Sequence, residues 1–222
     1  MLTALVFLPL VGALAIVVVA RGDQNIRLTA VAVALADLVL AVVIFARFDT
    51  DAPERFQFID RFEWISSTAF TAQYQMGVDG LSAPLVTLTG LLGLCAVLAS
   101  WHIKFRVREH FFWLLILQTA VMGVFSSLDL LLFFLFWEVE LIPMYFLITV
   151  WGSGRKEYSA LKFLLFTAGS SALMLISTRR DLGRGGDPQS VEDSIECPAF
   201  ITGESAAAKI TYDGFRAIGL VG

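Results

Sequence analysis

Two carboxylic acids stand two residues apart in a segment that is otherwise long and apolar enough to cross a lipid bilayer. Residues 130–151 carry no charge except at Glu138 and Glu140. An ionised acid at the centre of a bilayer costs roughly 2.5–3.5 kcal/mol or more, so such residues are rare and usually help to move an ion or a proton. The segment therefore predicts proton or cation transfer within a membrane.

Glu138 is the residue that we expect to act as a proton switch. It lies about nine residues, or roughly 13 Å, from the N-terminal end of a helix that rises about 1.5 Å per residue, which is close to the middle of a bilayer. Burial disfavours the charged form of a carboxyl group and a nearby cation favours it, so a moving cation can make the group take up or release a proton. The alternative is a neutral glutamic acid that forms a hydrogen bond to another helix.

Three further charged residues are weaker candidates for the same chemistry. Glu140 lies about 200° around the helix from Glu138, so the two acids are not expected to share one partner in a paired-carboxylate site. Asp37 lies near the middle of another apolar run, where it either joins a polar axis or pairs with another subunit. Lys162 lies near the start of an apolar run, where it either extends to the membrane surface or reaches Glu138 through a water relay.

The composition is typical of a multi-pass membrane protein. Apolar residues make up 57% of the 222 residues and charged residues only 16%, and the mean hydropathy is +0.76. A spanning helix needs about 20 apolar residues. The sequence therefore predicts an all-α bundle of six transmembrane helices, over residues 2–20, 28–46, 81–100, 111–128, 130–151 and 160–176.

Several other function classes are not expected. No basic patch with interleaved aromatic residues is present, so we expect no nucleic-acid partner. Cys95 lies in an apolar run, where we expect a small packed residue, and its spacing from Cys197 suggests neither a disulfide nor a metal site. His102 and His110 flank a loop and are expected to be solvated.

Loop charges predict the orientation. The first, third and fifth loops hold lysine and arginine, whereas the second loop, residues 49–79, is net acidic. The positive-inside rule then places the odd loops in the cytoplasm and the N-terminus outside. Alternating residues around Phe56–Phe58 and Phe62–Trp64 predict a short external hairpin within the second loop.

Residues 177–222 differ in composition from the rest of the chain. Glycine, serine, proline and charged residues replace the apolar runs, and no clear periodicity remains. We expect a division into a six-helix membrane domain over residues 1–176 and a polar tail over residues 177–222. The tail is predicted to be either disordered, a genuine soluble segment, or the product of a shifted reading frame.

Several motifs resemble one membrane-protein family. Phe133–Tyr145 (FFLFWEVELIPMY) resembles the fifth-helix signature of the antiporter-like subunit M (chain 4) of respiratory complex I, the proton-pumping NADH-quinone oxidoreductase. Tyr74–Ser82 resembles the segment that leads into its third helix, and Ala160–Phe163 and Phe166–Ser170 continue the match. The resemblance covers residues 1 to about 176 and corresponds to the N-terminal portion of the longer family members.

The resemblance implies a role and a set of partners. Glu138 would be the membrane glutamate that pairs with a lysine of a later helix, and that lysine lies outside this sequence. The chain would be a multi-pass subunit of a bacterial-type inner (plasma) membrane, in contact with lipid and with other membrane subunits of complex I. NADH, FMN, iron–sulfur clusters and quinone would be bound by other subunits, and this chain would hold no cofactor or metal and carry out no redox chemistry. The alternatives are a subunit of a multisubunit cation/proton antiporter and a non-functional fragment.

Overall fold

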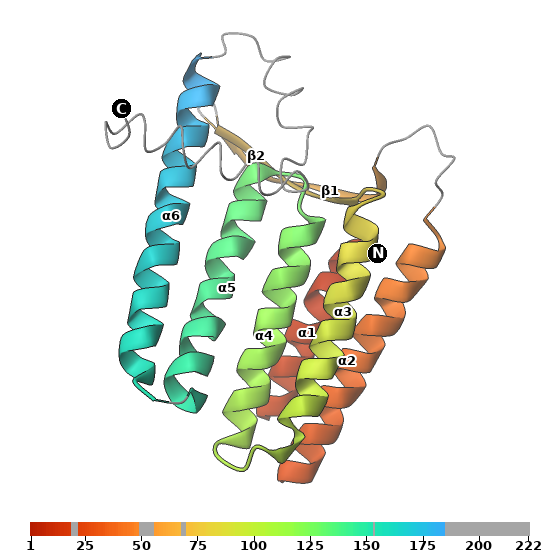
Figure 1. Ribbon diagram of the computed structural model, residues 1–222. Coiled ribbons are helices and arrows are strands. Elements are labelled where there is room, and N and C mark those ends of the chain that lie inside the picture. Colours follow the sequence, from red (N-terminus) through yellow and green to blue (C-terminus); the bar gives the residue numbers. More distant parts are fainter. Residues whose placement is uncertain (19–21, 49–55, 68–69, 153, 185–222) are drawn as a thin grey trace. The chain divides into compact units, whose positions relative to one another are not determined.

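The computed structural model describes residues 1–18, 22–48, 56–67, 70–152 and 154–184. It divides into two compact units, Met1–Ala160 and Leu161–Gly222. The first unit holds a helical bundle and a two-stranded sheet (Figure 1). The elements are α1 (Leu2–Val18), α2 (Asp23–Ala46), β1 (Gln57–Ser67), β2 (Phe70–Val78), α3 (Ser82–Ala99), the short 3-10 helix η1 (Ser100–His102), α4 (Val107–Ser126), α5 (Leu130–Trp151) and α6 (Lys156–Arg184).

Six α-helices therefore account for most of the described chain, which confirms the helical class. Four of the described helices are long and apolar enough to cross a membrane by length and composition: α2, α3 together with η1, α4 and α5. Helix α1 is apolar but shorter over its described residues.

Several predicted helices have different ends in the structure. Helix α4 begins at Val107 rather than at residue 111 and ends at Ser126 rather than at residue 128, and α6 begins at Lys156 rather than at residue 160. Helix α2 begins at Asp23 rather than at residue 28, because its first turn is polar and a search for apolar runs misses it. Asp23 also suits the first turn, where the helix dipole favours a negative charge. Helix α6 continues to Arg184, past the predicted end at Ile176, and its last residues include no proline that would stop it. The rest of the predicted tail, residues 185–222, lies outside the described residues.

Helix α4 is the central helix of the first unit. It packs against α1, α2, α3 and α5, and a larger share of it is buried than of the other three candidate spans. The outward faces of the other helices are apolar, with Val11, Leu35, Leu92 and Ile142 among the exposed side chains. Helices with an apolar outer face and a packed inner face suit a lipid environment, because hydrocarbon satisfies apolar side chains without burial in protein.

The core consists of two apolar clusters at different levels of the bundle. The first cluster includes Leu5, Ile44, Val78 and Met122, and it lies towards the sheet. The second includes Ile16, Ala30, Val97 and Phe111, and it lies towards the loop that joins α3 to α4. Each cluster draws on α1, α2, α3 and α4, so the two together hold these four helices along their length.

The predicted hairpin is present, with a different pairing of segments. Both aromatic segments that suggested it, Phe56–Phe58 and Phe62–Trp64, belong to or adjoin β1, and β2 supplies the antiparallel partner strand. The sheet is joined to the turn between α4 and α5, because Met76 forms a bridge with Ser127 and the Leu128 amide donates to the Gln75 carbonyl at 3.0 Å. The hairpin therefore fixes one end of the helical bundle.

Candidate functional site

Helix α5 carries Glu138 and Glu140, and its start is capped by a side chain. Asp129 is the N-cap residue, and its side chain accepts a hydrogen bond from the Leu131 amide at 2.8 Å. The helix then runs from Leu130 to Trp151, the same residues as the predicted span. At its far end the Trp151 indole N–H donates to the Phe105 carbonyl at 2.9 Å. The start of α5 is therefore capped locally, and its end is held to the loop before α4.

One face of α5 is anchored by aromatic packing. A Cβ atom on Gly123 of α4 would lie within 2.5 Å of the Phe136 ring, so this glycine is what allows the ring to reach α4. The rings of Phe136 and Phe7 lie 6.5 Å apart between centroids. Further along, Trp113 and Phe146 stack at 4.4 Å with an interplanar angle of 12°. These contacts set the rotation of α5 about its own axis.

The rotation of α5 places its two acids on different sides. Glu140 follows Phe136 by four residues and so lies on the anchored side, whereas Glu138 lies about 200° from Phe136 and points away from it. Both side chains are half-buried. Among the described residues up to Ala160, none forms a hydrogen bond or an ion pair with either acid. Glu138 therefore lies at mid-helix, and its carboxylate has no hydrogen-bond or ion-pair partner among the described residues of the first unit.

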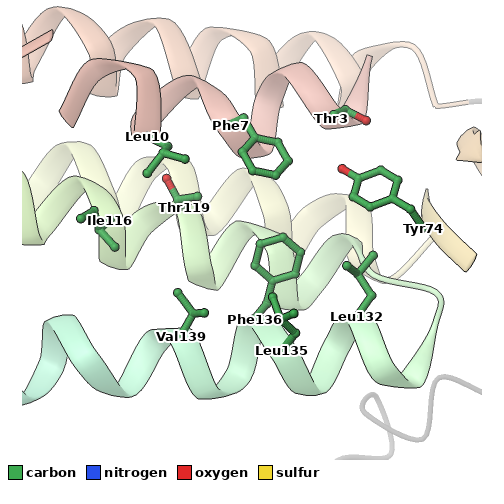
Figure 2. Close-up of a pocket in the computed structure, with 10 residues that line it drawn as sticks. All are labelled: Thr3, Phe7, Leu10, Tyr74, Ile116, Thr119, Leu132, Leu135, Phe136 and Val139. Atoms are coloured by element: carbon green, nitrogen blue, oxygen red, sulfur yellow. The ribbon is translucent and has the colours of Figure 1, made fainter. Parts of the chain in front are cut away.

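An apolar cavity of about 630 Å³ adjoins the anchored face of α5. Figure 2 shows Phe7 and Phe136 facing one another across it, with Thr3 and Tyr74 towards one end. The lining comes from α1, α4, α5 and β2: Thr3, Phe7, Leu10, Tyr74, Ile116, Thr119, Leu132, Leu135, Phe136 and Val139. Neither glutamate is among these residues, so the cavity holds no acid.

Asp37 has a partner within the chain that sequence reasoning missed. Its side chain is fully buried in α2, and the Gln118 amide of α4 donates to its Oδ2 at 2.5 Å. The sequence left open a polar axis or another subunit as its partner. The sequence did contain a hint of this pairing. Gln118 is a polar amide within a predicted span, and a buried polar group requires a hydrogen-bond partner.

Lys162 belongs to the second unit. It lies on the exposed surface of α6, and its ammonium lies 5.8 Å from the centroid of the Phe166 ring one turn later. Such an arrangement allows a modest cation–π attraction. Within α6, the lysine therefore has an aromatic neighbour and remains accessible.

Two minor predictions were wrong. His110 is buried rather than solvated, because its ring lies 4.8 Å from the Trp151 ring and its Nε2 lies 3.0 Å from the Ser100 hydroxyl. Cys95 is exposed rather than packed, because α3 presents that side of the helix outwards. Cys197 lies outside the described residues, and those described include no group of three or more metal-ligating side chains.

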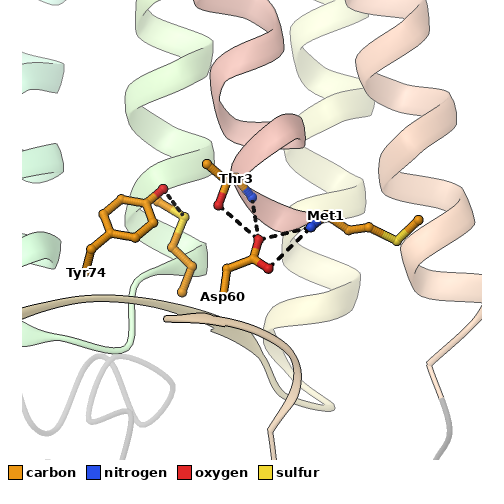
Figure 3. A network of polar contacts seen from close by, with 5 residues as sticks. Met1, Thr3, Asp60 and Tyr74 are labelled. Atoms are coloured by element: carbon orange, nitrogen blue, oxygen red, sulfur yellow. Dashed lines mark hydrogen bonds and ion pairs between the residues drawn. The ribbon is translucent and has the colours of Figure 1, made fainter. Parts of the chain in front are cut away.

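The sheet end of the first unit carries a network around Asp60 (Figure 3). The carboxylate accepts from the Met1 ammonium at 3.0 Å and from the Thr3 amide and hydroxyl at 3.1 and 2.9 Å. Burial by itself raises the pKa of Asp60. The hydrogen bonds from Thr3 and the positive charge of the Met1 ammonium lower the pKa by more than burial raises it, so the pKa lies below its ordinary value of 3.8. Nearby, the Tyr74 hydroxyl lies 3.0 Å from the Met76 sulfur. This network fastens α1 to β1.

The opposite end gathers the basic loops. The Arg27 guanidinium donates to the Ile103 carbonyl at 2.9 Å, which joins the start of α2 to the loop before α4. In the same loop, Arg106 adopts a left-handed backbone and forms an ion pair with Glu109 at 3.4 Å. The acidic hairpin and the basic loops thus lie at opposite ends of the first unit (Figure 1), an arrangement that agrees with the charge asymmetry of the sequence.

Comparison with known proteins identifies relatives among respiratory complexes. Residues 127–180 match the model of a family described as NADH:quinone oxidoreductase/Mrp antiporter, TM. The NAD(P)H-quinone oxidoreductase chain 4 2 of Thermosynechococcus vestitus is 39% identical over 187 residues, which cover 84% of this chain and 35% of that protein. The chain thus spans about a third of the length of the curated relatives that it matches.

Solved structures of such complexes contain the same fold. A chain of respiratory complex I from Thermus thermophilus with bound NADH matches with a TM-score of 0.66 and 23% identity, over 80% of this chain and 35% of that chain. A chain of the membrane-bound sulfane sulfur reductase, an archaeal respiratory membrane complex, matches with a TM-score of 0.70 and 16% identity, over 95% and 32% respectively. At identities of 23% and 16%, the likeness shows a shared fold alone.

Proposed function

We propose that this chain is a proton-translocating membrane subunit with Glu138 as its proton switch. Its similarity to chain 4 of NAD(P)H-quinone oxidoreductase and the match of residues 127–180 to the NADH:quinone oxidoreductase/Mrp antiporter family support the proposal. The observation that carries the proposal is the position of Glu138 at the middle of α5, on the side away from the anchored Phe136 face. A carboxylate held there is available to a cation from outside the first unit. Movement of that cation would change the proton affinity of Glu138.

The proposed chemistry is proton transfer, driven by electron transfer elsewhere in the complex. NADH, FMN, iron–sulfur clusters and quinone are proposed to be bound by other subunits. Pro143 lies one turn beyond Val139 and lacks a backbone N–H, so the Val139 carbonyl next to Glu138 has no helical donor. A carbonyl without its donor can bind water, and water beside Glu138 would give the proton a route to and from the carboxylate.

The test replaces Glu138 by glutamine in the assembled complex. We expect Glu138→Gln to reduce proton uptake coupled to NADH-driven quinone reduction at least about 10-fold, because the amide cannot take up a proton at neutral pH. Both rates are measured in the same sealed vesicles. Glu157→Gln is the matched control, because Glu157 is exposed at the first turn of α6 and carries the same change. Unchanged proton uptake in Glu138→Gln vesicles would refute the proposal.

A cation/proton antiporter subunit is the second candidate. It is favoured by the family description, which covers Mrp antiporters as well as NADH:quinone oxidoreductase. The two candidates separate in membranes that contain the complex. Proton movement that requires NADH and quinone supports the first, whereas proton movement driven by a sodium gradient without NADH supports the second.

The proposed topology is a multi-pass protein of a bacterial-type plasma membrane with its N-terminus and hairpin outside. Cysteines introduced singly at Ile59 on β1 and at Arg155 before α6 test it, because both positions are exposed. In a background without Cys95 and Cys197, a membrane-impermeant thiol reagent should label the first from outside in intact cells. It should label the second only after the cells are opened. The reverse pattern would overturn the orientation.

A further inference from the structure

Asp37 and Gln118 form a polar pair at the level where the two apolar clusters of the first unit meet. On α2, the residue one turn before Asp37 belongs to one cluster and the residue one turn after it belongs to the other. The same holds on α4 around Gln118. The flanking members are Ala34, Ala41, Leu115 and Met122. The pair is therefore enclosed above and below by apolar side chains.

The pair is sealed and built into the packing. Asp37 has no exposed surface and Gln118 is 5% exposed. On α3, a Cβ atom added to Gly93 would lie 2.5 Å from the Gln118 side-chain amide, so the absence of a side chain at Gly93 makes room for that amide. Three helices thus shape one small polar site.

The pair lacks one hydrogen-bond donor, because two of its oxygen atoms face no N–H or O–H group among the described residues. The Gln118 Nε2 donates to Asp37 Oδ2 at 2.5 Å. The other two side-chain oxygens, Asp37 Oδ1 and Gln118 Oε1, are buried without a hydrogen-bond donor among the described residues. An unpaired buried acceptor costs about 1–3 kcal/mol, and here two acceptors belong to the same pair.

The described residues around the pair offer no counter-charge for an ionised Asp37. Helices α1 and α3, which pack with α2, contain no lysine, arginine, histidine or acid over their described residues. On α4 the nearest titratable residue to Gln118 is His110, eight residues or about 12 Å along the helix. On α2 itself, Asp23 and Arg27 lie at least ten residues away. An ionised carboxylate here would be desolvated and unpaired, which is strongly unfavourable.

We propose that Asp37 and Gln118 form a proton-binding site in which Asp37 is kept as the neutral carboxylic acid. One proton on Oδ1 supplies the missing donor, and Gln118 Oε1 is the acceptor it would bond. The acid and the amide then form a cyclic pair with one hydrogen bond in each direction. The site holds its proton at neutral pH and fastens α2 to α4. This assignment is independent of the role of Glu138, because it concerns a different helix and a sealed site.

Infrared spectroscopy of the full chain in lipid bilayers tests the proposal. Aspartate labelled with ¹³C at the side-chain carboxyl separates Asp37 from Glu138 and Glu140. We expect a ¹³C-shifted carbonyl band of a protonated acid that persists at about pH 8, where exposed aspartates are ionised. The band should disappear in Asp37→Asn and shift in Gln118→Leu. A spectrum without a labelled acid band at that pH, or one whose band survives Asp37→Asn, would overturn the proposal.

A pair of substitutions gives a readout that does not depend on spectroscopy. Asp37→Asn preserves the cyclic pairing, because an amide also offers one donor and one acceptor to Gln118. We expect its thermal midpoint to stay within about 2 °C of the unmodified chain, whereas Asp37→Leu should lower it by about 5 °C or more. If Asp37 were ionised in the unmodified chain, Asp37→Asn and Asp37→Leu would both remove that charge, so the charge would not separate the two variants. If Asp37→Asn is as destabilised as Asp37→Leu, the neutral-acid pair is wrong.

Discussion

Asp37 and Asp60 carry the same carboxyl group in two regions of the first unit. Asp60 lies at the sheet end, where its oxygens accept hydrogen bonds from the amide and hydroxyl of Thr3 and from the Met1 ammonium. Asp37 lies between the apolar clusters, where one amide is its only bonded partner among the described residues. A positive partner and several donors favour the charged form, and a single neutral donor in a sealed site does not.

The difference shows how this fold uses acids at different depths. At the sheet end, a charged carboxylate joins α1 to β1, and partial access to solvent limits the cost of its charge. Between the helices, an acid is tolerable when a neighbouring amide can share its proton. Glu138 fits neither pattern, since no described residue up to Ala160 is bonded to it and, unlike Glu140, it lies on the side of α5 away from Phe136. This is why we assign the proton switch to Glu138 and a retained proton to Asp37.

Removal of the amide partner should have the largest effect on stability. Gln118→Leu leaves the Asp37 carboxyl group buried without a hydrogen bond, so we expect the free energy of unfolding to fall by about 3 kcal/mol. Chemical unfolding in mild detergent measures the change. The double variant Asp37→Leu with Gln118→Leu should recover much of the loss, because both polar groups are then absent. A double variant less stable than Gln118→Leu would contradict this account.

A smaller effect is expected when the pair is disturbed from the third helix. Gly93→Ala forces the Gln118 amide away from its present position, and we expect a loss of about 2 kcal/mol in unfolding free energy. Gly169→Ala is the control, because Gly169 is also a helical glycine and its added Cβ would meet nothing within 4 Å. Both variants gain the same helix propensity. Equal stability of the two variants would show that Gly93 is not needed for the pair.

At the sheet end, loss of the charge should cost less. Asp60→Asn keeps the shape of the side chain but removes the charge that Thr3 and the ammonium stabilise, and we expect a loss of about 1 kcal/mol. High salt should weaken the unmodified contact and leave Asp60→Asn unaffected. Unfolding followed at low and high salt measures both. A loss in Asp60→Asn as large as that in Gln118→Leu would remove the contrast between the two regions.

The pH dependence of the Asp60 contact gives the smallest effect. Because the folded pKa of Asp60 lies below its ordinary value of 3.8, the stabilisation is fully present above that value and is lost as the pH falls through the folded pKa. We therefore expect acid to narrow the difference in stability between the unmodified chain and Asp60→Asn. Thermal midpoints between about pH 3 and pH 7 measure this trend. A difference that widens in acid would mean that the sign is wrong.

Much of the fold could be predicted because hydropathy is a local property of the sequence. The span over residues 130–151 was predicted residue by residue. The start of α2 and the end of α6 were not, because helices continue into polar segments where hydropathy gives no signal. The hairpin was predicted from alternation, but its pairing was not, since strand partners are set by contacts between distant residues.

By itself, the sequence determined that the chain is a helical membrane protein with acids at mid-helix, because the cost of charge in hydrocarbon makes such residues conspicuous. It also placed Glu138 and Glu140 on different sides of one helix, because the helical period fixes that angle. Only the tertiary structure decided that Asp37 meets Gln118, that Gly93 makes room for them, and that Asp60 meets the start of α1. These residues lie far apart along the chain, and only the packing of the helices brings them together.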